Sequence, residues 1–179
     1  MAVFTVSKVA NDNYALRWPG NKLTVLTKMV DFTVAANNLA VNGIMAIFKI
    51  PAKTHVVQFG MRVVTADTTV TRVNLGAYTE DPTTLAYTVI DDDGFCVGSG
   101  DSGATLAVAG YVAMDVNAAF NLQGASAGYV FAADSVLTVT NVDADSSTID
   151  EAVVEFFAIV VDMSGYSSIT PGGSGSYTT

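Results

Sequence analysis

The chain has 179 residues, of which half are hydrophobic and only 14% are charged, and its formal net charge is −9. This length suits a single domain with a substantial core. The negative charge excludes general affinity for nucleic acid, whose phosphates the chain would repel. With one cysteine, Cys96, and one histidine, His55, an internal disulfide and a zinc site are also excluded.

Charge is divided unevenly along the sequence. All eight Lys and Arg lie at or before Arg72, with three of the 17 acids, whereas the other 14 acids follow it. This division predicts a molecule that docks in one orientation on a charged partner. The low overall charge also favours an oligomer, because subunit interfaces are depleted in charged residues.

Residues 1–22 come first and break at Trp18-Pro19-Gly20-Asn21, a strong turn signal. We interpret them as an extended N-terminal arm outside the core. Residues 23–163 are predicted to form the domain itself. Residues 164–179, rich in Gly, Ser and Thr, are predicted to form a flexible C-terminal tail.

Within the domain, β-branched and aromatic residues mark short strands in chain order. Before position 78 we expect strands over 23–34, 43–50, 55–65 and 70–77, with a corner at 51–54. The middle is looser, with a turn at 80–82, a strand over 85–90, a loop over 91–103, a strand within 105–114 and a helical turn near 116–120. Strands are expected again over 128–131, 135–142 and 152–162, and the last is expected to be central and buried on both faces.

This pattern predicts an all-β fold, because no segment has a helical period and no internal repeat is visible. The strand number favours an antiparallel β-sandwich of jelly-roll or Greek-key type. No apolar run approaches the ~20 residues that span a membrane. The N-terminus shows no signal peptide pattern. We therefore expect synthesis in a cytoplasm and no membrane partner.

Reactive groups are scarce, so we predict no enzyme activity, no catalytic residues and no cofactor. His55 begins a strand and is interpreted as a hydrogen-bonding residue, and Ser99 and Ser102 lack the context of a nucleophile elbow. Two acidic segments, Asp91-Asp92-Asp93-Gly94 and Asp143 to Glu151, are interpreted as solvated loops. Neither has EF-hand spacing, and calcium binding through their carboxylates stays an open hypothesis.

Two stretches of the chain resemble the head decoration, or capsid cement, proteins of tailed bacteriophages. One is the strand–corner–strand segment 47–57, and the other comprises 133–140 and 153–164; together they cover about a third of the chain. The resemblance implies a jelly-roll-like virion structural protein that forms a homotrimer on the capsid surface and bridges copies of the major capsid protein. It implies no catalytic residues, and synthesis in the host cytoplasm.

We expect Arg17, Trp18, Lys22 and Lys28 to make the capsid contact, because Arg and Trp dominate many interfaces and three copies would add avidity. One alternative is a carbohydrate-binding or adhesin module of a virion fibre or cell surface. It would need an exposed aromatic platform drawn from Tyr78, Tyr87, Phe95, Tyr111 and Tyr129. The second alternative is a tail or connector subunit.

Overall fold

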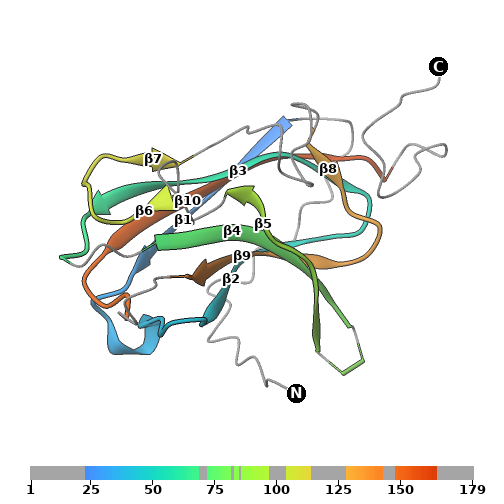
Figure 1. Ribbon diagram of the computed structural model, residues 1–179. Helices are drawn as coiled ribbons and strands as arrows, with labels where there is room; N and C mark the ends of the chain where they lie inside the picture. Colours follow the sequence, from blue (N-terminus) through green and yellow to red (C-terminus); the bar gives the residue numbers. More distant parts are fainter. Residues whose placement is uncertain are drawn as a thin grey trace.

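The computed structural model describes residues 23–68, 72–81, 83–84, 86–96, 104–113, 128–142 and 148–164. Over these ranges the chain forms two antiparallel five-stranded sheets that lie one above the other in Figure 1. The predicted all-β sandwich is therefore confirmed. The arm predicted over 1–22, the tail beyond 164 and the helical turn near 116–120 lie outside these ranges.

The first sheet has the strand order β1-β10-β3-β7, and the short strand β8 pairs with the other end of β3. Its strands are β1 (Leu23–Asp31), β10 (Val153–Asp162), β3 (Thr54–Thr65), β7 (Val112–Ala113) and β8 (Tyr129–Val130). The second sheet has the order β2-β9-β4-β5, and β6 pairs with β4. Its strands are β2 (Ile44–Ile50), β9 (Ser135–Asn141), β4 (Arg72–Glu80), β5 (Tyr87–Cys96) and β6 (Ala104–Thr105).

Short connections explain how the chain passes between the sheets. The 3-10 turn η1 (Ala35–Asn37) follows β1. The predicted corner at 51–54 is confirmed, and it carries the chain from β2 in one sheet to β3 in the other. Lys53 has a φ of 63° there, a left-handed conformation that makes the change of direction tight. Within the described ranges no helix is long and apolar enough to cross a membrane.

The two halves of the sequence are interleaved in space. Strand β10 lies between β1 and β3, and β9 lies between β2 and β4. Two ion pairs join the basic and acidic parts directly, with Lys49 Nζ 3.0 Å from Glu80 Oε1 and Arg62 Nη2 2.7 Å from Glu155 Oε2. The division of charge along the sequence therefore does not become a basic half and an acidic half of the described fold, which corrects the orientation argument above.

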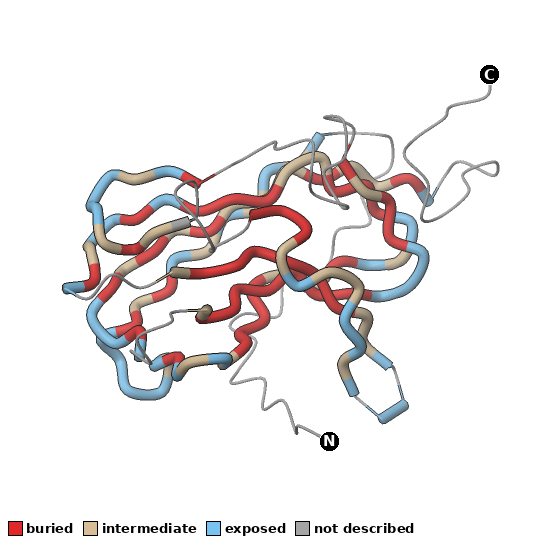
Figure 2. The backbone as a smooth tube through the Cα atoms, viewed as in Figure 1, coloured by how far each residue is buried: buried red, intermediate tan, exposed pale blue. Residues whose placement is uncertain are grey.

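The core lies between the sheets (Figure 2). Strand β10 contributes alternate residues to it, whereas every residue of β9 is buried. Phe59 of β3 is at its centre, with ring centroids 5.7 Å from Phe95, 6.2 Å from Phe48 and 6.5 Å from Phe156. All four rings come from different strands, so this cluster connects both sheets. Aromatic pairs with edge-on geometry add to the stabilisation from apolar burial.

Several predicted boundaries are wrong. Strand β1 ends at Asp31 rather than 34, where the Asp31 carboxylate accepts hydrogen bonds from the Thr33 backbone and hydroxyl and starts a turn. Strand β4 continues to Glu80 rather than 77. The expected strand within 105–114 is two short strands, β6 and β7, joined by a turn. The strand expected over 85–90 begins at Tyr87 and continues to Cys96.

The loop expected over 91–103 is the largest error, because Asp91–Cys96 belongs to β5. Its pairing with β4 jumps from Leu75↔Cys96 to Ala77↔Asp91, so several β5 residues bulge out opposite Gly76. A Cβ on Gly76 would lie 2.3 Å from the Asp92 carbonyl carbon. Because Gly76 has no side chain, the bulge can pack directly on β4. This packing places Phe95, which belongs to the bulge and is fully buried, in the core.

Candidate assembly surface

The outer face of the first sheet is the most extended exposed apolar surface in the described fold. Eight large hydrophobic residues are strongly exposed, and five of them come from this sheet: Leu23, Val25, Met29, Val64 and Val112. Antiparallel partners point to the same face. The β1 residues are therefore flanked by β10 residues through the pairs Leu23↔Val161, Val25↔Ile159 and Thr27↔Phe157.

Strand β10 shows the two faces of the sheet clearly. Its inward residues are buried. Its outward residues are only half-buried, and they are Val153, Glu155, Phe157, Ile159 and Val161. The expectation that this strand is buried on both faces is therefore wrong, since no described element packs over the outer face. An outward face composed of Val, Phe and Ile would ordinarily be covered by another surface.

Charges on this face neutralise each other. Arg62 and Glu155 are cross-strand partners as well as an ion pair. Beside them, the Phe157 ring covers Gly60, because a Cβ at Gly60 would lie 2.6 Å from Phe157 Cζ. The result is an apolar surface with few uncompensated charges, which is the composition of an interface centre rather than of a solvated sheet.

Of the predicted docking residues, Arg17, Trp18 and Lys22 lie outside the described residues. Lys28 lies on β1 and points to the inner side, where its Nζ donates to the Ile47 carbonyl of β2 at 3.4 Å. Partial burial lowers the pKa of Lys28. The structure thus places this ammonium between the edges of the two sheets, and its docking role stays a prediction.

A second feature is the carboxylate cluster of the β5 bulge. Carboxylate oxygens of Asp91, Asp92 and Asp93 lie within 4.8 Å of one another. These residues belong to β5 and not to a loop as predicted from the sequence. Burial first, and then the neighbouring Asp91 and Asp92, raises the pKa of Asp93 to about 6. Such oxygens suit a hard cation. Calcium binding stays an open hypothesis, and residues 143–147 of the other acidic segment lie outside the described ranges.

We expect Asp93→Asn to stabilise the chain at pH 7.5 but not at pH 4. Because the native pKa of about 6 exceeds the unfolded value of about 3.9, the folded state binds more protons between these values. Stability therefore falls as pH rises through this window. Solvent screens the partly exposed cluster, so we expect a gain in Tm of about 2–4 °C at pH 7.5.

Thermal unfolding at both pH values measures this effect. Asp81→Asn is the matched control of opposite sign, because hydrogen bonds from the Thr84 and Thr83 backbone lower the pKa of Asp81. That variant should lose stability at pH 7.5. An equal Tm change for Asp93→Asn at both pH values would contradict the assignment.

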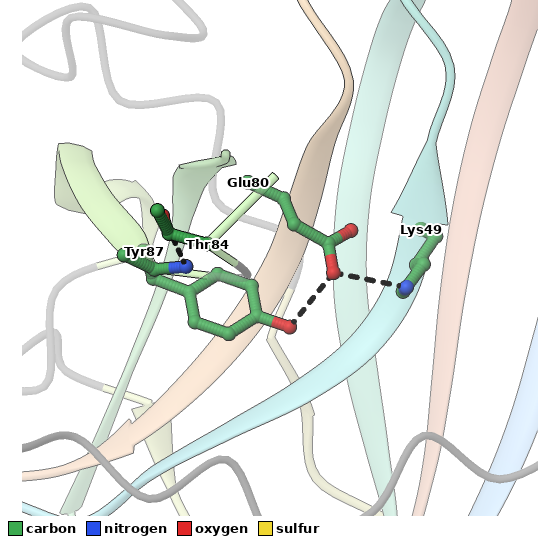
Figure 3. A network of polar contacts seen from close by, with 5 residues as sticks. Lys49, Glu80, Thr84 and Tyr87 are labelled. Carbon is green, nitrogen blue, oxygen red and sulfur yellow. Dashed lines mark hydrogen bonds and ion pairs between the residues drawn. The ribbon is translucent and has the colours of Figure 1, made fainter. Parts of the chain in front are cut away.

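A polar network lies near the start of β5 (Figure 3). Glu80 Oε1 accepts hydrogen bonds from Lys49 Nζ at 3.0 Å and from the Tyr87 hydroxyl at 3.2 Å. These three residues come from β2, β4 and β5, so the network ties the edges of the second sheet to its centre. Its members hold each other in place, which indicates a structural role.

The described residues also locate the other chemical candidates. His55 is 9% exposed at the start of β3, and Cys96 is buried and not in a disulfide. Of the five aromatic candidates for a carbohydrate platform, Tyr78 and Phe95 are buried and Tyr87, Tyr111 and Tyr129 are half-buried. The strongly exposed large hydrophobic residues in these ranges are all aliphatic or Met.

No family model and no curated protein matches the sequence. Among solved structures, a chain in the capsid of Ralstonia phage GP4 is similar over 88% of this chain and 94% of its own, with a TM-score of 0.56 and 16% identity. A chain in the acidic stable capsid of Helicobacter pylori bacteriophage KHP30 aligns over 79% of this chain and 90% of its own, with a TM-score of 0.37 and 14% identity. The first likeness shows a shared fold, and the second is too weak to support an argument.

Proposed function

We propose that this chain is a non-enzymatic structural protein of a bacteriophage virion. In this proposal it decorates and stabilises the capsid surface as a trimer that bridges copies of the major capsid protein. The observation that carries the proposal is the fold shared with a chain in the capsid of Ralstonia phage GP4. Since the alignment covers 88% of one chain and 94% of the other, the likeness extends over a whole subunit rather than one motif.

The chemistry of the described residues supports a binding role. Asp91, Asp92 and Asp93 are the only group of potential metal ligands within those ranges. The histidine and the cysteine both belong to buried strand positions. What the fold offers to solvent is instead a broad apolar face with a neutralised ion pair, and such a face suits contacts between subunits.

Docking on the shell is assigned to the arm and to the adjoining outer face of the first sheet. Arg17, Trp18 and Lys22 lie shortly before β1 in the sequence, so the arm joins the domain at Leu23, the first residue of that strand. Lys28 is bonded to Ile47, so the larger contribution falls on the three arm residues. A trimer would present three such contacts on one rigid body, and the summed binding would exceed that of each contact.

The test of this function is the copy number of the chain on purified particles. We expect quantitative mass spectrometry to find a near-equimolar ratio to the major capsid protein, because a decoration protein occupies every equivalent site of a symmetric shell. A deletion of residues 1–22 should lower the bound amount by at least about tenfold if the arm supplies ~1.4 kcal/mol or more of binding.

Other results separate the alternatives. A few copies per particle would contradict decoration and favour a tail or connector subunit. Absence from every particle would favour the carbohydrate-binding module, which a glycan array can then examine. Full binding by the truncated chain would leave the decoration role in place but refute the arm as the docking element.

A further inference from the structure

We propose that the β5 bulge and the central strand β9 together form a calcium site. Its protein ligands are the carboxylates of Asp91, Asp92 and Asp93 and the hydroxyl of Thr138. Neighbouring carboxylates alone are a common surface feature, so the decisive residue is Thr138. The site lies on the second sheet, away from the outer apolar face of the first, and it does not depend on the capsid role.

The three carboxylates form a compact group of hard oxygen ligands. Their oxygens lie within 4.8 Å of one another, a spacing that a single cation can bridge. The ion pairs of the described ranges use Lys49 and Arg62 with other acids, so neither pair compensates this charge. Burial and the two neighbouring carboxylates raise the pKa of Asp93 to about 6. A bound cation would remove that repulsion.

Thr138 has a property that an ordinary acidic turn lacks. The residue is 1% exposed, and its Oγ1 has no hydrogen-bond partner among the described residues. Burying a hydroxyl without a partner is unfavourable, and the great majority of such groups in native proteins are bonded. A buried hydroxyl with unused lone pairs beside three carboxylates therefore indicates a ligand that contacts both.

The strand register aims this hydroxyl at the bulge. Thr138 is the antiparallel partner of Gly76, so its side chain leaves the sheet on the face to which a Cβ of Gly76 would point. Two such Cβ positions are about 5 Å apart. The space above Gly76 holds the bulge itself, since that Cβ would lie 2.3 Å from the Asp92 carbonyl carbon and 2.4 Å from the Asp91 carbonyl oxygen. Thr138 thus lies beside the segment that carries the carboxylates.

A second threonine on the same face of β9 gives a direct comparison. Thr140 is also buried, and its Oγ1 makes no hydrogen bond of good geometry. It nevertheless lies close enough to the Tyr78 hydroxyl to oppose the increase in pKa that burial first, and then Asp92, cause in that phenol. Thr140 therefore has a polar neighbour within the protein, whereas Thr138 has none in the described ranges.

Calcium suits this ligand set better than other common metal ions. All the offered ligands are oxygens, whereas zinc sites are built mainly from Cys and His. Magnesium requires near-ideal octahedral geometry, whereas calcium accepts roughly six to eight oxygens in flexible arrangements. Asp92 is exposed, so water can complete the coordination on that side.

Titration of the purified, EDTA-treated chain tests the site. We expect one Ca²⁺ per chain with a Kd of about 0.1–1 mM, in the range of the weaker calcium sites of proteins. Calcium at about tenfold above Kd should raise Tm by about 3 °C or more. Mg²⁺ at the same concentration is the control for charge screening on this acidic chain. The proposal is overturned if calcium gives neither heat nor a Tm increase, or if Mg²⁺ gives an equal increase.

Thr138→Val separates a ligand from a structural residue. In EDTA this variant should be at least as stable as the native chain, because valine has a similar shape and removes the unpartnered hydroxyl. Its Kd for calcium should nevertheless increase at least about tenfold, as for loss of a group that supports a metal site. Thr140→Val is the matched control and should keep the native Kd. An unchanged Kd in Thr138→Val, or an equal increase in both variants, would remove Thr138 from the site and refute the proposal.

Asp92→Asn gives a second test that does not alter the buried face of the sheet. Asp92 is exposed, so the variant should fold, and its Kd for calcium should also increase at least about tenfold. Asp81→Asn, at an exposed carboxylate outside the bulge, should leave the Kd unchanged. Equal Kd values for the two aspartate variants would contradict the site. Because these measurements use no capsid, their failure is distinguishable from failure of the proposed function.

Discussion

Replacing Gly76 with alanine is expected to destabilise the protein strongly. The new Cβ would lie 2.3 Å from the Asp92 carbonyl carbon and 2.4 Å from the Asp91 and Asp92 carbonyl oxygens. These are backbone atoms of the β5 bulge, so no side-chain rotation relieves the clash. Relief requires β5 to move off β4, which would also withdraw Phe95 from the core. We expect a loss of at least ~3 kcal/mol, a large share of the stability of a typical domain.

Gly110→Ala is the matched control. Gly110 has a φ of +81°, but nothing lies within 4 Å of its Cβ position. Its substitution therefore tests backbone conformation alone and should cost about 1–2 kcal/mol. Urea denaturation of both variants measures the difference. Similar losses for the two would contradict the close packing of the β5 bulge on Gly76.

Phe59→Ala is expected to lower the free energy of unfolding by about 3–5 kcal/mol. Phe59 is fully buried and its ring lies within 6.5 Å of three others, Phe48, Phe95 and Phe156. Removing it would leave a cavity where both sheets meet, and the surrounding β-strands can collapse only partly to fill it. Phe48 and Phe95 would also lose their edge-on contacts with this ring.

The control for this prediction is Val108→Ala, at a side chain that is 55% exposed. That change should stay within about 0.5 kcal/mol. Chemical denaturation with a common m-value for both variants gives the comparison. A loss for Phe59→Ala as small as that for Val108→Ala would show that the four rings do not form the centre of the core.

The strands that the sequence predicts best are those whose side chains satisfy local rules. The β-branched runs of β2, β3, β9 and β10 identify these strands within a residue or two of their ends. The corner after Ile50 follows from Pro51 and the residues around it. Such features depend on neighbours along the chain, which the sequence displays directly.

The prediction of the β5 segment is wrong because this strand depends on a residue that is distant in the sequence. Three successive aspartates oppose strand formation by propensity, and the feature that allows it, the glycine at 76, is 15 residues away from Asp91. Burial of Phe95 against the Phe59 ring outweighs the local preference. A contact of this kind becomes visible only when β4 and β5 are already paired.

The outer apolar face of the first sheet could not be predicted from the sequence either. In β1 both sets of alternate residues are largely apolar, with Leu23, Val25 and Met29 on one and Leu26 and Val30 on the other. The face that is buried is decided by β10, more than 120 residues later in the chain. For the same reason the bond from the Lys28 amine to the Ile47 carbonyl was not foreseen from the sequence.

The placement of β9 and β10 has a consequence for how the protein is made. Both sheets have a central strand from the last 45 residues, since β9 begins at Ser135 of a 179-residue chain. While a ribosome is still adding them, β1 cannot meet β3 and β2 cannot meet β4, so the emerging polypeptide holds unpaired strands. Folding must therefore wait until β9 and β10 have been synthesised, and it depends on pairings between distant residues, which form slowly. A premature stop codon before residue 153 would yield a product with neither sheet closed, which cellular proteases would degrade.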